Sequence, residues 1–193
     1  MISAIVLAAG QSKRMGQPKM LMPWGHTCVI GKVISTLFAA DIEDIHVVMG
    51  ASQIELKAAL QNYELDYLFN KDFENGEMLT SVQVGLSGAR NKSEAVLIVL
   101  GDQPQIELSV VQAIVKRYSS THNKIIVPSY QMHRGHPWLV EKSYWSEIFS
   151  LTPPHTLHNF LTMHNEAIDY IVVDSASVIQ DLDTESDYKR YKP

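Results

Sequence analysis

Residues 3–19 read SAIVLAAGQSKRMGQPK, and the fold is inferred outward from this stretch. Its first part, residues 3–8, is an apolar run that ends at a glycine-containing loop. A short run of this kind is typical of a β-strand that is buried on both faces of a sheet. The loop that follows carries Lys13, Arg14 and Lys19 within seven residues. The stretch therefore predicts a buried strand followed by a cationic loop.

Strand-like and helix-like segments alternate along the rest of the chain. Strands are predicted at residues 45–49, 66–69, 95–100, 125–127, 138–140 and 170–173. Helices are predicted at residues 29–40, 53–60, 78–87, 143–150 and 156–164, around Val110–Tyr118, and after the N-cap pattern of Thr184 and Asp187. This alternation implies βαβ units with right-handed crossovers. We expect one domain, residues 1–193, with a three-layer, Rossmann-like α/β fold and a mainly parallel sheet.

Composition restricts the class of protein. The 193 residues are 46% hydrophobic and carry a formal net charge of -5, as expected of one soluble domain. Cys28 is the one cysteine, which excludes an intramolecular disulfide and a Cys-rich zinc module. The first apolar run precedes its basic residues, so neither a signal peptide nor a membrane span is predicted. We therefore expect a cytoplasmic protein with no membrane partner. Because long Lys/Arg tracts are absent from the sequence, we also expect no nucleic-acid partner.

The loop from Ala8 to Lys19 is the first candidate site, because ligands of parallel α/β sheets bind at the carboxyl ends of strands. Gly10 and Gly16 allow close approach of the backbone, and the cations suit a polyphosphate. The loop differs from a P-loop and from a Rossmann fingerprint in its glycine spacing. Pro18 predicts an extended loop here rather than entry into a helix. A solvated turn with surface charges is the alternative.

Carboxylates supply the second and third candidates. Asp102 follows the predicted strand at residues 95–100, where a carboxylate can hold a hard cation against phosphate oxygens. Asp181 and Asp183 come just before the last helix. The alternatives are a turn-capping role for Asp102 and favourable helix-dipole contacts for the other two. A cationic loop combined with separated carboxylates is what metal-assisted phosphoryl chemistry requires.

Five segments of the chain resemble the MobA-like nucleotidyltransferases. LAAGQSKRMGQPKMLMPW, residues 7–24, matches their LxxGxSxRMGxxK signature. The other four, in order, are GEMLTSVQVGL (76–86), GDQP (101–104), RGHP (134–137) and DLDTESDY (181–188). The resemblance spans nearly the whole chain and is closest to the branch of molybdenum cofactor cytidylyltransferases.

The resemblance implies a GT-A-like nucleotide-diphospho-sugar transferase fold and a set of functional residues. Its nucleotide-binding residues would be Ala8, Ala9, Gly10, Arg14, Lys19, Ser81 and Asp102. Its catalytic residues would be Arg14, Lys19 and Asp102. Asp102 and Asp183 would hold Mg²⁺, with Mn²⁺ as the alternative ion, and Gly135 and His136 would bind the acceptor.

The implied reaction transfers CMP from CTP to the terminal phosphate of molybdopterin and releases pyrophosphate. A molybdoenzyme or its maturation chaperone would receive the product. The LAAG alanines favour CTP over GTP, whereas His158 departs from the basic residue often found on the pterin-side helix. Three alternatives stay open: another nucleotide such as GTP, another phosphate or sugar-phosphate acceptor, and a nucleotide-binding protein without turnover.

Two histidine pairs have HxxH spacing, His133 with His136 and His155 with His158. Such pairs can serve as zinc ligands. Here they have no cysteine partners, and prolines interrupt the flanking structure. We therefore expect no zinc at either pair.

Overall fold

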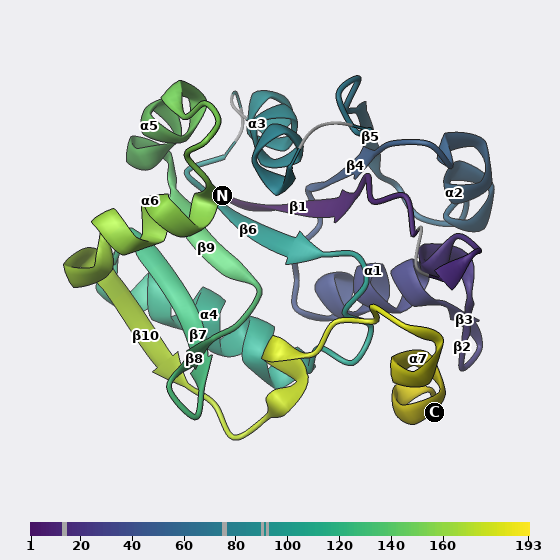
Figure 1. The fold of residues 1–193 in the computed structure, drawn as a ribbon. Coiled ribbons are helices and arrows are strands. Elements are labelled where there is room, and N and C mark those ends of the chain that lie inside the picture. Colours follow the sequence, from purple (N-terminus) through teal and green to yellow (C-terminus); the bar gives the residue numbers. More distant parts are fainter. Residues whose placement is uncertain (13–14, 75–76, 90, 92) are drawn as a thin grey trace.

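The computed structural model describes residues 1–12, 15–74, 77–89, 91 and 93–193 (Figure 1). Its eight-stranded sheet has the order β10-β7-β9-β6-β1-β4-β5, with β8 paired to β7. The strands are β1 (Ile2–Ala8), β4 (Ile45–Met49), β5 (Asp66–Phe69), β6 (Ala95–Leu100), β7 (Ile125–Tyr130), β8 (His133–Arg134), β9 (Trp138–Glu141) and β10 (Ile168–Val172). β8 and β9 pair antiparallel to their neighbours, and every other pairing in this sheet is parallel. A mainly parallel α/β sheet is thus confirmed.

Helices cover both faces of the sheet and make three layers (Figure 1). One face carries α1 (Val29–Ala39), α2 (Gln53–Ala59) and α4 (Leu108–Thr121), and the other carries α3 (Met78–Ala89), α5 (Trp145–Ser150) and α6 (Leu157–Met163). Side chains alternate along β1, so Ala4 and Val6 pack on the first layer while Ile5 and Leu7 pack on the second. Burial on both faces explains why this strand is continuously apolar.

A third hydrophobic cluster joins the two ends of the chain. Trp24 of the hairpin β2 (Pro23–Trp24) and β3 (Thr27–Cys28) packs with Leu182 and with Tyr188 of α7 (Glu185–Tyr191). The Tyr188 hydroxyl donates to the carbonyl of Pro23 at 2.5 Å. This cluster holds the segment before α7 against the loop that follows β1 (Figure 1).

Sequence-based expectations and structure differ where elements are short. The strands at residues 45–49, 66–69 and 95–100 have the expected bounds, whereas the β2–β3 hairpin and β8 were not expected. The helix expected at residues 143–150 is divided into the 3-10 helix η3 (Lys142–Tyr144) and α5. The prediction that Pro18 keeps the loop extended is wrong, because the 3-10 helix η2 (Lys19–Leu21) follows it directly. Proline restricts the residue before it but is tolerated where a helix begins.

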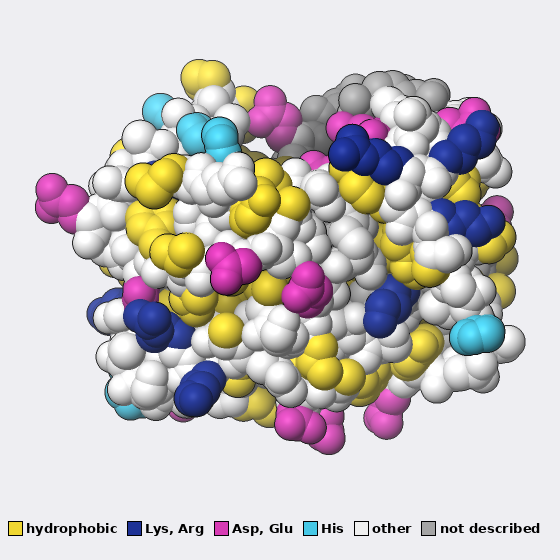
Figure 2. Space-filling view, turned by 90° about the horizontal axis from the view of Figure 1, so that it is seen from below, with side chains coloured by type: hydrophobic (Ala, Val, Ile, Leu, Met, Phe, Trp, Pro, Cys, Tyr) yellow, Lys and Arg dark blue, Asp and Glu magenta, His cyan; other side chains and the backbone are white. Residues whose placement is uncertain are grey.

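Charged side chains are intermixed on the face seen from below Figure 1. Figure 2 shows acidic and basic side chains there singly or in small groups, separated by apolar and polar atoms. The net charge of -5 is therefore not gathered into one acidic region on this face. None of the described helices is both long and apolar enough to cross a membrane.

Candidate functional site

A cavity of about 250 Å³ lies at the carboxyl ends of β1 and β6, which are adjacent parallel strands. Its wall contains five of the residues that the sequence singled out: Ala9, Gly10, Lys19, Ser81 and Asp102. These residues come from three separate parts of the chain. They meet because the strand ends and the start of α3 are brought to one edge of the sheet.

Lys19 is a positively charged residue at the centre of this edge of the sheet. Its ammonium forms an ion pair with the Asp102 carboxylate and lies 3.5 Å from Asp183 Oδ1. The side chains of Lys19 and Asp102 are largely buried, with 12% and 16% of their surfaces exposed. The Lys19 backbone N–H donates to the Ser12 hydroxyl at 3.1 Å, which ties η2 to the preceding loop. The structure thus brings Lys19, Asp102 and Asp183 together, as expected.

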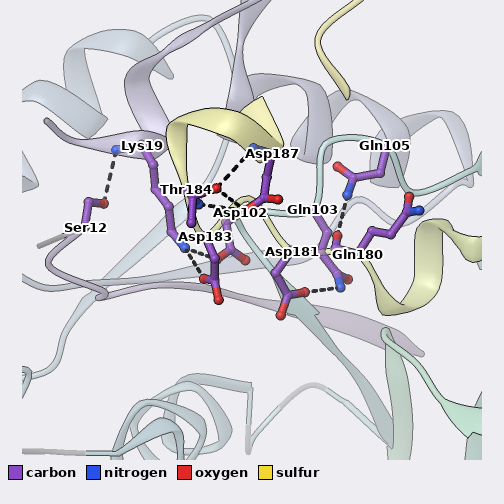
Figure 3. A network of polar contacts seen from close by, with 10 residues as sticks. All are labelled: Ser12, Lys19, Asp102, Gln103, Gln105, Gln180, Asp181, Asp183, Thr184 and Asp187. Atoms are coloured by element: carbon purple, nitrogen blue, oxygen red, sulfur yellow. Dashed lines mark hydrogen bonds and ion pairs between the residues drawn. The ribbon is translucent and has the colours of Figure 1, made fainter. Parts of the chain in front are cut away.

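Leu182 explains how the carboxylates of the last segment reach this edge. Leu182 is fully buried in the third hydrophobic cluster, and its N–H donates to the Asp102 carbonyl at 3.2 Å. Figure 3 shows Asp181 and Asp183, on either side of Leu182, with their carboxylates directed to the same side beside Asp102. Thr184 then caps α7 through a reciprocal pair of hydrogen bonds with Asp187. Anchoring of Leu182 and of the helix start therefore fixes where both carboxylates point.

Asp181 lines the cavity; the sequence placed it in the third candidate segment, but the resemblance assigned the metal-binding role there to Asp183 alone. Loss of surrounding water, followed by the negative charge of Asp102, raises its pKa above the ordinary value. A hydrogen bond from Gln103 Nε2 at 2.6 Å acts in the opposite direction. The DLD segment was the available signal, but the position of Asp181 in the cavity wall depends on tertiary packing.

Ser81 is held by a buried asparagine. Asn70 is 1% exposed and donates from Nδ2 to the Ser81 hydroxyl at 3.0 Å. Phe73, Glu77 and Met78 complete this side of the wall. Glu77 and Met78 belong to the GEMLTSVQVGL segment, but the resemblance assigned a role only to Ser81 in it, and Phe73 lies in the polar loop before it.

The other residues expected to bind the nucleotide have different environments. A Cβ built on Gly10 meets nothing within 4 Å, so the backbone there is open to a ligand. The Ala8 side chain packs in the layer of α1 and α4, so only its backbone faces the loop. Arg14 and Lys13 lie outside the described residues.

Gly135 and His136 lie between β8 and β9, beside the end of β6. A Cβ atom added to Gly135 would stand 2.5 Å from Val178. The Gly135 carbonyl accepts a hydrogen bond from Trp138 Nε1 at 2.7 Å. The His136 ring stacks on Trp138 with 4.3 Å between ring centroids. Burial lowers the pKa of His136 to about 4. The imidazole is therefore neutral at pH 7, and it can offer a hydrogen bond but no positive charge.

The donor set at the cavity fits a hard divalent cation. Asp102, Asp181 and Asp183 supply carboxylate oxygens, which Mg²⁺ and Mn²⁺ prefer. Among the described residues, Lys19 is paired with Asp102 and Asp183, and its charge also lowers the pKa of Asp181. A second group of potential metal ligands lies elsewhere in the described structure. It consists of Asp44, His46 and Asp66, whose ligand atoms all lie within 4.8 Å of one another. Neither HxxH pair belongs to it.

Comparison with known proteins identifies relatives along the full length. The family model of the MobA-like NTP transferase domain matches residues 4–168. The molybdenum cofactor cytidylyltransferase of Escherichia coli strain K12 is 27% identical over 188 residues, which cover 97% of this chain and 93% of that protein.

Solved structures share the fold. Rv0371c of Mycobacterium tuberculosis H37Rv superposes with a TM-score of 0.86 and 25% identity, covering 98% of this chain and 96% of that one. Its complex with manganese gives a TM-score of 0.80 at 24% identity, with the same shares of 98% and 96%. A nucleotidyl transferase from Methanothermobacter gives 0.84 at 20% identity, covering 100% of this chain and 96% of that one. The expected GT-A-like fold is confirmed.

Proposed function

The chain belongs to the MobA-like NTP transferase family, and from this premise we propose that it transfers CMP from CTP to the terminal phosphate of molybdopterin, releasing pyrophosphate. The observation that carries the proposal is the meeting of Lys19 with Asp102 and Asp183 at the carboxyl edge of the sheet. The cytidylyltransferase relative, matched over 97% of this chain, supports the choice of nucleotide and acceptor.

The nucleotide would bind with its triphosphate along the loop after β1. Backbone groups of Ala8, Ala9 and Gly10 line that loop, and the space over Gly10 admits close approach. Lys19 would contact the phosphates, together with Arg14 on the strength of the family signature. The base or ribose would lie toward Ser81, whose hydroxyl is already oriented by Asn70.

Asp102 and Asp183 would hold Mg²⁺ or Mn²⁺, and the position of Asp181 makes it a third oxygen donor. The ion, when bound, would neutralise charge on the nucleotide phosphates. Lys19 would then exchange its contacts with these carboxylates for contacts with the phosphates. Its charge would stabilise the negative charge that grows on the α-phosphoryl group during transfer.

The transfer itself needs positioning more than covalent chemistry. An acceptor phosphate oxygen forms a bond to the α-phosphorus of CTP, the bond from that phosphorus to the bridging oxygen breaks, and pyrophosphate leaves with the electron pair. The attacking phosphate is ionised near pH 7, so no dedicated general base is required. Gly135 and His136 would shape the acceptor side, with His136 as a neutral hydrogen-bonding group.

The experiment is pyrophosphate release with CTP, GTP or ATP, each with Mg²⁺ or Mn²⁺ and with molybdenum cofactor as acceptor. Release that requires CTP and the cofactor supports the proposal, whereas a preference for GTP refutes the nucleotide assignment. Nucleotide binding without release with any acceptor would favour a binding protein.

A transferase with another phosphate or sugar-phosphate acceptor is the second candidate. His158, an exposed residue of α6, is the observation that favours it, because it stands where the family often has a basic residue on the pterin-side helix. Parallel reactions with sugar 1-phosphates distinguish the two acceptors. A molybdoenzyme or chaperone partner and a cytoplasmic location stay predictions.

A further inference from the structure

Asp44, His46 and Asp66 form a cluster at the opposite edge of the sheet, where β4 and β5 begin. His46 and Asp66 are register partners in these parallel strands, so their side chains project on the same face. Asp44 lies two residues before His46 in the approach to β4. The cluster is distinct from the cavity at the carboxyl edge that the proposed function uses.

His46 is buried with one ring nitrogen unsatisfied. The residue is 2% exposed, and its Nε2 lies 3.2 Å from Asp44 Oδ2. A carboxylate can only accept, so this contact places the ring proton on Nε2. Nδ1 has no hydrogen-bond partner among the residues that the structure describes. Its lone pair is therefore available to a ligand.

Asp66 faces that free nitrogen across a gap of suitable width. Asp66 Oδ2 lies 3.5 Å from His46 Nδ1. Two ligands about 2.1 Å from a tetrahedral Zn²⁺ stand roughly 3.4 Å apart. The two atoms already have the separation that one shared ion would impose.

Asp44 orients the His46 ring through its contact with Nε2. It also accepts a hydrogen bond from the buried Ser3 hydroxyl, which fixes the carboxylate. A carboxylate that orients the second nitrogen of a metal-binding histidine is the usual support for such a ligand. Direct ligation would thus come from His46 and Asp66, with orientation by Asp44.

The surroundings attract cations. A cavity of about 600 Å³ adjoins the two carboxylates of the cluster, because Asp44 and Asp66 line it together with Glu43 and Glu64, whereas His46 does not. The Met1 ammonium at its rim is paired with Glu94 at 3.0 Å. Concave walls of one sign of charge raise the local concentration of counter-ions.

We propose that Asp44, His46 and Asp66 make a site for a transition-metal dication, with Zn²⁺ the preferred ion. One imidazole nitrogen with carboxylate oxygen suits Zn²⁺ better than Mg²⁺, which prefers oxygen donors alone. The bound ion ties the edge strand β5 to β4 at their amino ends and raises the stability of the fold.

The test measures Zn²⁺ binding by calorimetry to the full chain, without a histidine tag and after chelator treatment, in the absence of nucleotide. All variants carry Asp102→Asn, which weakens the carboxyl-edge site and keeps any contribution from Asp181 and Asp183 the same in every protein compared. Asp66→Asn and His46→Gln should each weaken binding at least about tenfold. Glu64→Gln, a change in the same cavity wall, should leave the affinity unchanged. Zn²⁺ should also raise the thermal midpoint of the Asp102→Asn protein but not of its Asp66→Asn derivative.

Equal affinity for Zn²⁺ in the Asp102→Asn protein and its Asp66→Asn derivative overturns the proposal, as does the absence of binding at millimolar Zn²⁺. His46 is buried and its variant could unfold, but Asp66 is 59% exposed, so the Asp66→Asn result decides the matter. Co²⁺ in place of Zn²⁺ gives a second readout, because its visible absorption should require His46. None of these measurements depends on nucleotidyl transfer, so failure here leaves the proposed function untouched.

Discussion

Folding stability should fall steeply in mild acid because of His136. Its folded pKa is about 4, against an ordinary value of 6.5, and burial is the main cause. Between these values the unfolded chain takes up a proton that the folded protein does not. The contribution of this group to the free energy of unfolding is therefore present in full well above pH 6.5 and is lost as pH falls toward 4. At about 1.4 kcal/mol per pH unit, the loss from pH 8 to pH 5 is about 2 kcal/mol.

The assay is urea unfolding at pH 8 and pH 5 for wild type, His136→Gln and His133→Gln. His133 is the matched control, because it lies three residues away in the same connection but is exposed. The His136→Gln variant should lose about 2 kcal/mol less than wild type between the two pH values. His133→Gln should behave as wild type. A wild-type pH dependence in His136→Gln would refute the claim that this ring is neutral in the folded protein.

Three other substitutions test separate parts of the structure. Lys19→Gln should lower the rate of pyrophosphate release by about 10²–10³-fold with an unchanged circular dichroism spectrum, and full activity would contradict its role. Asp181→Asn should weaken Mg²⁺-dependent nucleotide binding in calorimetry. It should also slightly raise the thermal midpoint at pH 8, because a carboxyl whose pKa is raised destabilises the fold once it is ionised. Gly85→Ala should cost about 1–3 kcal/mol in urea unfolding, because its Cβ would stand 2.2 Å from Ile5 Cγ2 in the core, and a neutral result would contradict that packing.

The central strands were predictable because burial on both faces requires an unbroken apolar run. The segments at residues 45–49 and 95–100 have the bounds that their sequences indicate; the segment at residues 66–69 does too, although it is a partly exposed edge strand. The same reasoning fails for the two-residue strands β2, β3 and β8, which are too short to show a period. The β2–β3 hairpin depends instead on the turn at Gly25, with a φ of 56°, and on packing against α7.

The candidate site was predictable at the level of its motifs and less so at the level of its geometry. Asp102 ends a buried strand, so both its position and its edge of the sheet follow from the sequence. The cavity position of Asp181 does not, because it depends on Leu182 packing between the hairpin and α7. The lowered pKa of His136 likewise depends on loss of surrounding water in the folded protein, which no local pattern predicts.

His46 was missed for a related reason. The IHVVM segment predicts a buried strand, and no local pattern indicates that its histidine could bind a metal. Asp66 faces it only because β5 pairs with β4 in a particular register. Sites that form across strands require the pairing to be known first.

The central claim is that the carboxyl edge around Asp102 carries out nucleotidyl transfer. The most direct measurement is single-turnover pyrophosphate release from CTP with molybdenum cofactor and Mg²⁺, for wild type, Asp102→Asn and the Glu64→Gln control at the far edge. We predict release by wild type and Glu64→Gln, and release at least about 10²-fold slower in a folded Asp102→Asn protein. Equal rates in Asp102→Asn and wild type would contradict the claim.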